Sequence, residues 1–270
     1  MEGFEIGETS VQTPTPLHIN FSIQKADTSG EQNVGRISVW NLNDEHLSML
    51  HEKDCIVTLR AGYGSHMPLI FVGAITFVET AEDGADRETK IEASDGRIAI
   101  RDSYISVSYS GNVSTKKVID DVITEMGVSL AVSHNAEFDS LPNGFSYVGK
   151  AAGALDKLCA TNGHDWQIQN GVLNIKNRCD TMTREAYLIS PETGLVGIPK
   201  KIMIGQDGKS DGQPGYEVVY LLNGAIGIGD YIRLESSKVQ GYFRIHTVEH
   251  SGDSNGEGGW VSQSQILEVT

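Results

Sequence analysis

Alternation of apolar and polar residues dominates the first 110 positions and predicts β-strands. Residues 17–23 and 35–40 both follow the period of two that is typical of a strand with one buried face, and a turn at residues 27–30 separates them. Near residue 43 the apolar spacing changes to three or four, which predicts a short helix over residues 43–53. Further strands are expected at residues 55–61, 69–78, 89–94 and 104–109.

The pattern takes a helical period in the middle of the chain. Apolar residues recur every three or four positions across residues 115–126 and again across 151–162, so both segments are expected to be amphipathic helices. Gly127 and Gly163 follow them and are expected to end them. Farther on, Asn170-Gly171 between two alternating runs predicts a tight β-hairpin. This part is expected to be a small α+β unit.

Strand patterning returns from Arg184 onward. Strands are expected at residues 196–205, 217–222, 231–235, 241–249 and 260–269. At about 150 residues per domain, the chain length alone predicts about two domains. The pattern refines this to a β-rich α+β protein with β domains at residues 1–110 and 181–270 and an α+β insert at 111–180.

Acidic residues outnumber basic ones by 36 to 21, which gives a formal net charge of −15. The excess is −9 over residues 1–110, −2 over 111–180 and −4 over 181–270. A protein that binds DNA or anionic lipid through phosphate neutralisation needs the opposite balance, so both functions are disfavoured. With 39% hydrophobic and 21% charged residues, the chain is expected to be folded and not disordered.

The cysteines and the apolar segments favour a product of a reducing cytosol. Cys55, Cys159 and Cys179 show no CxxC spacing, and three is an odd number for a disulfide framework. The N-terminal Met-Glu-Gly-Phe-Glu has neither a basic nor an apolar region, so no signal peptide is expected. The longest apolar stretch, residues 69–78, is too short to span a bilayer.

Two motifs have some features of cofactor or metal sites. Residues 224–229 have the spacing GxxGxG, which differs from the GxGxxG of dinucleotide sites, and a turn before the strand at residue 231 is expected there. His246 and His250 are four residues apart in a predicted strand and share a face, but no third ligand accompanies them. We expect neither a cofactor nor a metal.

Two arrangements have some features of catalytic sites. Cys159 and His164 lie five residues apart across a helix end, without an orienting partner or an oxyanion donor. Asp120 and Asp121 are adjacent on a predicted helix and therefore point to different faces, and the acidic stretch 79–86 is expected to be a solvated turn. No catalytic residue is expected, so the function is expected to depend on surfaces.

Nearly the whole chain contributes to an ordered set of motifs. In order they are Ile37-Ser38-Val39-Trp40-Asn41-Leu42, Val57 to Tyr63, Ile70 to Ile75, Lys90 to Gly96, the helix after Ser114-Thr115, the helix 151–162 with Trp166 and the Asn170-Gly171 hairpin, Ile228 to Leu234, Gly241 to Ile245, His250 to Asp253 and Trp260. This set resembles the phage baseplate hub proteins. Each motif is loose, and the specificity lies in their order.

The resemblance implies a homotrimer in which two tube-type β-barrel domains per subunit form a pseudo-six-fold ring. Such a ring joins the six-fold tail tube to a three-fold spike or tail-tip protein and lets DNA pass without specific binding. Other baseplate proteins and the tape measure protein are further implied partners. The resemblance also implies a virion tail component made in the host bacterial cytoplasm, without membrane insertion or enzymatic activity.

An acidic turn is the one candidate surface that the sequence offers. We hypothesise that Glu79, Glu82, Asp83 and Asp86 contribute to the lumen or rim of the ring. An acidic lumen adheres weakly to phosphates, which suits a channel that DNA slides through.

Three other functions stay open at this point. A distal tail or tube-initiator protein has a related barrel and forms a six-fold ring. A tail-associated cell-wall hydrolase predicts activity that depends on residues such as Asp120 and Glu125, and a glycan-binding module predicts exposed aromatic residues and no three-fold ring. The oligomeric mass distinguishes the hub from these alternatives.

Overall fold

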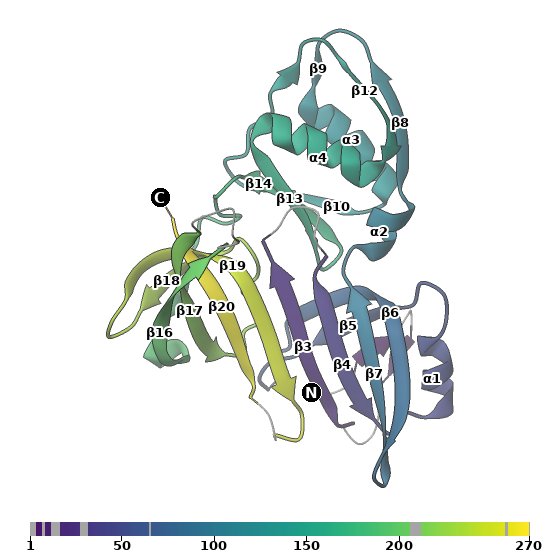
Figure 1. The fold of residues 1–270 in the computed structure, drawn as a ribbon, viewed down its shortest axis with the longest axis vertical. Coiled ribbons are helices and arrows are strands. Elements are labelled where there is room, and N and C mark those ends of the chain that lie inside the picture. Colours follow the sequence, from purple (N-terminus) through teal and green to yellow (C-terminus); the bar gives the residue numbers. More distant parts are fainter. Residues whose placement is uncertain are drawn as a thin grey trace.

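The computed structural model describes residues 4–6, 9–11, 17–27, 32–64, 66–205, 212–256 and 259–269. It places an α+β part at one end of a broad, curved β-sheet (Figure 1). Buried hydrophobic side chains form three clusters, one within residues 19–93 together with Leu222, one within 105–175 and one within 189–266. The β-rich α+β class predicted from the sequence is confirmed. Among the described residues, every helix is too short or too polar to cross a membrane.

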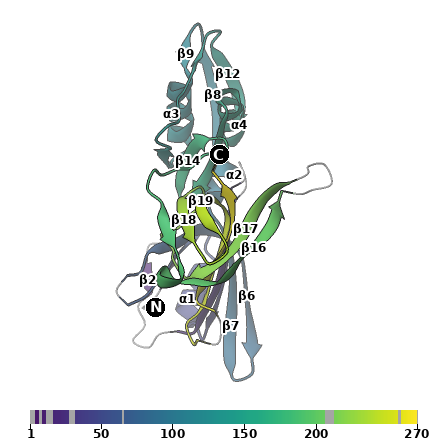
Figure 2. The ribbon, with the colours of Figure 1, turned by 90° about the vertical axis from the view of Figure 1, so that its left-hand side faces the viewer.

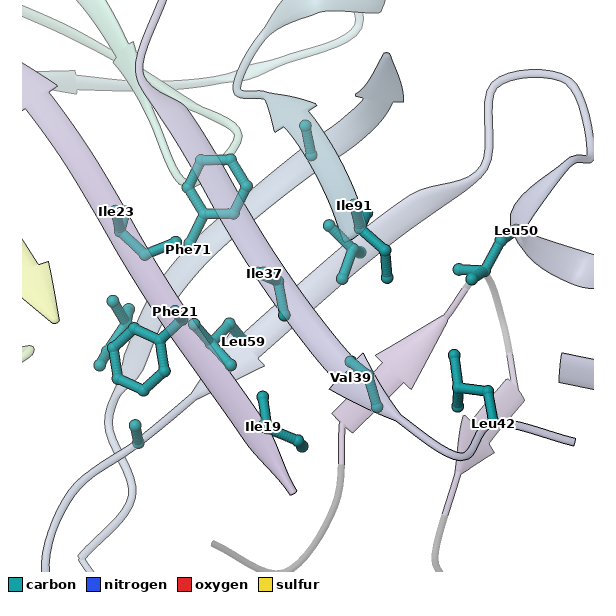
Figure 3. Close-up of a cluster of buried hydrophobic side chains, with 14 of the residues drawn as sticks. Ile19, Phe21, Ile23, Ile37, Val39, Leu42, Leu50, Leu59, Phe71 and Ile91 are labelled. Atoms are coloured by element: carbon teal, nitrogen blue, oxygen red, sulfur yellow. The ribbon is translucent and has the colours of Figure 1, made fainter. Parts of the chain in front are cut away.

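The first β part follows the predicted alternation closely. Its elements are β1 (Phe4–Ile6), β2 (Thr9–Val11), β3 (Ile19–Ala26), β4 (Val34–Trp40), helix α1 (Asp44–Leu50), β5 (Ile56–Arg60), β6 (Leu69–Asp83) and β7 (Asp86–Ser94). Alternate residues of β3 and β4 are buried and pack with Phe71 of β6 in the first cluster (Figure 3). A Cβ at Gly35 would lie 2.7 Å from the Phe71 ring, so the ring fills the space that this glycine leaves.

Local signals define both α1 and the hairpin of β6 and β7. Asn43 caps α1, because its Oδ1 accepts a hydrogen bond of 2.8 Å from the His46 N–H. The predicted acidic turn is narrower than expected: β6 continues to Asp83, and β7 begins at Asp86. Only two residues turn the chain, and Gly84 takes a positive φ of 66° there. The long hairpin extends past the rest of the sheet (Figure 1).

The α+β part contains both predicted helices with their predicted bounds. Its elements are α2 (Arg97–Asp102), β8 (Tyr104–Tyr109), β9 (Val113–Ser114), α3 (Thr115–Met126), β10 (Ser129–Val132), β11 (Ser140–Leu141), β12 (Phe145–Lys150), α4 (Ala151–Asn162), β13 (His164–Gln169) and β14 (Val172–Asn177). Gly127 and Gly163 end α3 and α4 in the left-handed conformation. The predicted hairpin joins β13 to β14, and β10 pairs parallel with β14.

One strand belongs to a different part of the fold than the sequence suggested. The prediction placed residues 104–109 in the first β domain, with a boundary near residue 110. In the structure β8 pairs antiparallel with β12, and Ile105 packs in the second cluster. The exposed-buried alternation of β8 shows that one of its faces is covered, but it does not show which element covers that face.

The last β part completes the sheet. Its elements are β15 (Tyr187–Ile189), the 3-10 helix η1 (Pro191–Thr193), β16 (Leu195–Ile204), β17 (Gln213–Leu221), β18 (Tyr231–Glu235), β19 (Gln240–Asp253) and β20 (Val261–Glu268). β16 and β17 form a hairpin that projects from the molecule (Figure 2). β19 pairs antiparallel with β3 over Thr247–Asp253 and Asn20–Ala26, so the two β parts share one 13-stranded sheet.

Candidate functional site

One face of the shared sheet is polar across both β parts. Eight strands follow one another in the order β16, β17, β20, β19, β3, β4, β7 and β6, and each pair of neighbours is antiparallel. Residues directly opposite one another in such pairs lie on the same face. We call this surface the polar face. Its exposed and half-buried polar side chains are Lys200, Glu217, Gln263, Gln265, Thr247, Glu249, Ser251, Asn20, Ser22, Gln24, Arg36, Ser38, Glu88, Lys90, Glu92, Ser94 and Glu79.

Hydrogen bonds between strands order this face. Ser22 Oγ donates to Glu249 Oε1 at 2.7 Å across the boundary between β3 and β19. Arg36 donates from Nε to Glu92 Oε1 and from Nη1 to Gln24 Oε1, each at 3.3 Å. Because these side chains bond to one another, a polar surface crosses the boundary between the two β parts. Toward the outer strands the same face also exposes the apolar side chains of Val196, Leu221 and Phe77.

The charge of the polar face is negative. Five exposed or half-buried carboxylates, from Glu79, Glu88, Glu92, Glu217 and Glu249, lie on it, and a sixth, from Asp253 opposite Asn20, is buried. The basic side chains listed above number three, from β4, β7 and β16. A surface with this balance disfavours phosphate binding, which depends on a surplus of lysine and arginine.

The four acidic residues singled out in the sequence are not gathered on one face. Glu79 lies on the polar face opposite Lys90, whereas Glu82 lies opposite Arg87 on the other face of the hairpin. Asp86 begins β7, and its Oδ1 accepts a 2.9 Å hydrogen bond from Asn41 Nδ2. Asp83 ends β6, and its side chain lies outside the described atoms. The strand period explains the split, since residues 79 and 82 differ by an odd number.

Two buried ion pairs that share the Asp27 carboxylate join the three parts of the fold. The Asp27 carboxylate follows β3 and lies 3.1 Å from Lys176 Nζ of β14 and 2.6 Å from Arg244 Nη1 of β19. All three side chains are at most 7% exposed. Removing one member of such a group leaves buried charge uncompensated, so the arrangement fixes the three parts together.

The turn of the β13–β14 hairpin is held next to this junction. Asn170 and Gly171 both have positive φ, 52° and 77°, as the shortest hairpin turns require. Asp95 accepts hydrogen bonds from both of their N–H groups, that of Gly171 at 3.0 Å. Asn33 Nδ2 donates to the Ile168 carbonyl at 3.0 Å, so the first β part binds the hairpin through both Asp95 and Asn33.

Burial shifts the pKa values of three groups at the junction. Desolvation raises the pKa of Asp95 to about 6 and the pKa of Asp230 to about 6, although backbone N–H donors oppose both shifts. Desolvation lowers the pKa of Lys25 to about 8, and the carboxylates of Asp95 and Asp230 limit that shift. These groups lie between elements and stabilise their arrangement, and the sequence offers no signal that brings them together.

The cysteine and histidine weighed as a catalytic dyad lack the required chemistry. Burial in the second cluster raises the pKa of the Cys159 thiol to about 12, and the carboxylates of Asp156 and Asp165 add to this. Burial also lowers the pKa of His164. A thiol with such a pKa stays protonated at neutral pH and is a poor nucleophile.

The candidate carboxylate pair and the candidate histidine ligands do not form a catalytic or metal site either. Asp120 pairs with Lys116 at 2.9 Å along α3, while Asp121 pairs with Lys117 at 3.8 Å. Over the described part of the chain, no group of three or more histidine, cysteine or acidic side chains is arranged to hold a metal. The glycine-rich segment 224–229 forms turns before β18, as predicted.

His250 gives a testable pH dependence of stability. It is fully buried in the sheet with Nδ1 2.8 Å from Ser262 Oγ, and burial lowers its pKa to about 3. Below its unfolded pKa of about 6.5, the unfolded chain binds a proton that the folded chain excludes, so stability falls as the pH falls. We expect this histidine to cost about 2 kcal/mol of unfolding free energy between pH 7.5 and pH 5. Urea denaturation at the two pH values measures it.

The control for this prediction is His250→Leu, which removes the titrating ring from the same site. Asp95 and Asp230 have raised pKa values and contribute a slope of opposite sign, because the folded chain binds their protons more tightly. The difference in pH dependence of the unfolding free energy between the wild type and the variant gives the contribution of His250. Equal pH slopes in the two proteins would contradict the prediction.

Comparisons with known proteins show which family and which fold the chain is similar to. The family model of the baseplate hub gp41 matches residues 4–251. A search of curated protein sequences finds no match. Among the solved structures that share the fold are three tail-related proteins at low identity. The 43 kDa tail protein of prophage MuSo2 from Shewanella oneidensis is 10% identical with a TM-score of 0.65, and the alignment covers 98% of this chain and 97% of that one.

The other two solved structures are similar to this chain to about the same extent. A tail protein from Neisseria meningitidis MC58 is 8% identical with a TM-score of 0.68, over 98% of this chain and 95% of that one. The E. coli c3393 protein is 9% identical with a TM-score of 0.68, over 99% and 77%. It is described as a type VI secretion component similar in structure to the T4 tail proteins gp27 and gp5. The chain therefore has a phage tail protein fold and belongs to the family of the baseplate hub gp41.

Proposed function

We propose that this baseplate protein acts as a trimeric hub whose six β parts form a pseudo-six-fold ring around a channel. The observation that carries the proposal is the polar face, which runs without interruption from one β part to the other through the β3–β19 pairing. Two β parts in each of three chains give six similar units. A ring of this kind matches a six-fold tube on one side and a three-fold spike on the other.

The polar face suits the wall of a channel for DNA. It is mostly polar, ordered by its own hydrogen bonds and negative in charge, and this charge disfavours adhesion of phosphates. The tip of the β6–β7 hairpin, with Glu82 and Asp86, is proposed as the rim of the ring, and Glu79 as part of its lumen. In this role the protein acts as a passive conduit and has no enzymatic activity.

The proposed partners follow from the same geometry. The tail tube protein, a spike or tail-tip protein, other baseplate proteins and the tape measure protein are the candidates, and the site of action is the virion tail after synthesis in the bacterial cytoplasm. The division of the chain into two ring-forming domains and an α+β insert stays a prediction.

The number of subunits in the assembled ring tests this function. We expect a mass three times that of the 29.3 kDa chain, and ring-shaped particles with three-fold symmetry in electron micrographs. Sedimentation over a series of protein concentrations separates a weak trimer from a monomer, because assembly follows mass action. A hexameric ring would instead identify a distal tail or tube-initiator protein, and a neutral or basic channel wall would contradict the acidic lumen.

A further inference from the structure

A buried lysine of the first β part contacts the turn of the β13–β14 hairpin. Lys25 occupies the last buried position of β3, on the same face as Phe21 and Ile23, and it is 4% exposed. Its Nζ donates a 3.4 Å hydrogen bond to Oδ1 of Asn170. Within the described part of the chain, this oxygen is the one hydrogen-bond partner of Nζ, and Nζ forms no ion pair there. A lysine is almost never fully buried unless it is paired, so this position points to a special role.

The surroundings of Lys25 favour its neutral amine. Burial lowers the pKa of Lys25 to about 8, although the charges of Asp95 and Asp230 act against this shift. At pH 7 about one such side chain in ten is neutral, compared with about one in 2,500 for an exposed lysine. The neutral amine carries a free electron pair and is the nucleophilic form of the side chain.

The carboxamide that faces this amine is held in place. Asp95 is 1% exposed and accepts hydrogen bonds from the N–H groups of Asn170 and Gly171. The Asn170 backbone is therefore fixed, and its carboxamide stays at the end of the Lys25 side chain. A small shift of Nζ from Oδ1 to the adjacent Cγ brings the reacting atoms into contact. Groups held in this way reach effective concentrations of about 10⁵ M and above.

A cavity adjoins the two side chains. Its volume is about 400 Å³, and Lys25, Asn170 and Asp230 are all among the residues that line it. Burial raises the pKa of Asp230 to about 6, so this carboxylate can take up and return a proton near neutral pH. A polar cavity of this size has room for water and for a small leaving group.

We propose that Lys25 and Asn170 form an intramolecular isopeptide bond. The neutral Nζ attacks Cγ of Asn170, and one proton passes from Nζ to the Asp230 carboxylate across the cavity. Asp230 returns this proton to Nδ2 of Asn170 as the Cγ–Nδ2 bond breaks, so ammonia leaves and the carboxylate is restored. One C–N bond forms and one breaks, and the step needs neither an oxidant nor a reductant.

The bond joins two parts of the fold covalently. It links β3 to the β13–β14 turn between residues 145 positions apart, next to the ion pairs of Asp27. A cross-link that closes such a long loop stabilises the folded chain, because it restricts the unfolded one. The inference goes beyond the proposed ring and does not depend on it, since every group involved belongs to one chain.

The mass of the intact chain tests the bond. We expect the wild type to be lighter than its sequence by one ammonia, about 17 Da. After trypsin digestion, the segment that contains Lys25 is expected to be uncut at this residue and joined to the segment that contains Asn170. A wild-type chain at its sequence mass overturns the proposal. A gain of about 1 Da at Asn170 would show hydrolysis of the carboxamide and overturns it as well.

Two variants each remove one reacting group. Lys25→Met replaces the amine with an apolar end, and Asn170→Gly keeps a residue that favours the positive φ of the turn. Both are expected to fold, which circular dichroism checks, and to have their full sequence mass. The matched control is Lys116→Met, which removes an exposed lysine of α3 and is expected to keep the loss of ammonia. Loss of ammonia in Lys25→Met would contradict the assignment.

The proton carrier is tested by a rate. Asp230→Asn keeps an acceptor for the Gly227 N–H, which now donates to Asp230 Oδ2 at 2.7 Å, and removes the group that takes up the proton. We expect the bond to form at least about tenfold more slowly in this variant. The cross-linked fraction, measured by mass at intervals after cell-free synthesis, gives the rate. A rate equal to that of the wild type overturns the role of Asp230.

Discussion

Replacing Asp27 with alanine is expected to lower the free energy of unfolding by about 3–5 kcal/mol. The carboxylate is the shared partner of Lys176 and Arg244, and all three groups are buried. Alanine leaves two cations in the interior without a counter-charge, and their desolvation is then uncompensated. For a chain of this size the melting temperature is expected to fall by roughly 10 °C. Urea denaturation followed by circular dichroism measures the effect.

An exposed ion pair provides the control. Asp44 lies 3.2 Å from Arg87 Nη2 and its side chain is 90% exposed, so Asp44→Ala is expected to cost less than about 1 kcal/mol. The comparison separates burial from pairing, since both variants remove a carboxylate from an arginine. If Asp27→Ala costs no more than Asp44→Ala, the junction does not hold the three parts together.

Replacing Trp166 with alanine is expected to cost about 3–5 kcal/mol, because it empties a large volume in the second cluster. Trp166 is 2% exposed, and its Nε1 donates a 2.9 Å hydrogen bond to Asp156 Oδ1. Trp166→Phe keeps part of the ring volume and loses the donor, so an intermediate loss of about 1–2 kcal/mol is expected. Chemical denaturation of the three proteins gives the order.

Hydrogen exchange of the same variant tests the predicted division of the chain. If the α+β part folds as its own unit, Trp166→Ala speeds exchange in α3 and α4 and spares β3, β4 and β19. Equal acceleration throughout the sheet would mean that the three clusters unfold as one. Because the buried ion pairs of Asp27 join the α+β part to both β parts, some faster exchange is also expected in the neighbouring strands. The double variant Asp27→Ala/Trp166→Ala measures the energetic coupling between the two sites.

Local patterns predicted the parts of the fold that local physics determines. The helices α3 and α4 have their predicted bounds, because a 3.6-residue apolar period and a following glycine are both contained in one short segment. The turn at Asn170-Gly171 was predicted for the same reason, since both residues favour positive φ. α2 was missed, because six residues are too few to show a helical period.

Long-range partners were beyond the reach of these patterns. The pairing of β3 with β19 joins residues more than 200 positions apart, and alternation shows only that each strand has a buried face. The same limit hid the pairing of β8 with β12 and the meeting of Asp27 with Lys176 and Arg244. For the candidate surface, the acidic stretch 79–86 was visible in the sequence, but its split between two faces depends on how far the strands of the hairpin extend.

The β3–β19 pairing makes the six boundaries between neighbouring β parts of the proposed ring unequal in mechanical strength. Three of them lie inside a chain, where seven consecutive residue pairs are backed by the buried charges around Asp27. The other three form only when copies meet and have no such backing. A force that stretches the ring outward is therefore expected to separate the boundaries between copies first. It would release three rigid segments, each carrying an unbroken third of the channel wall.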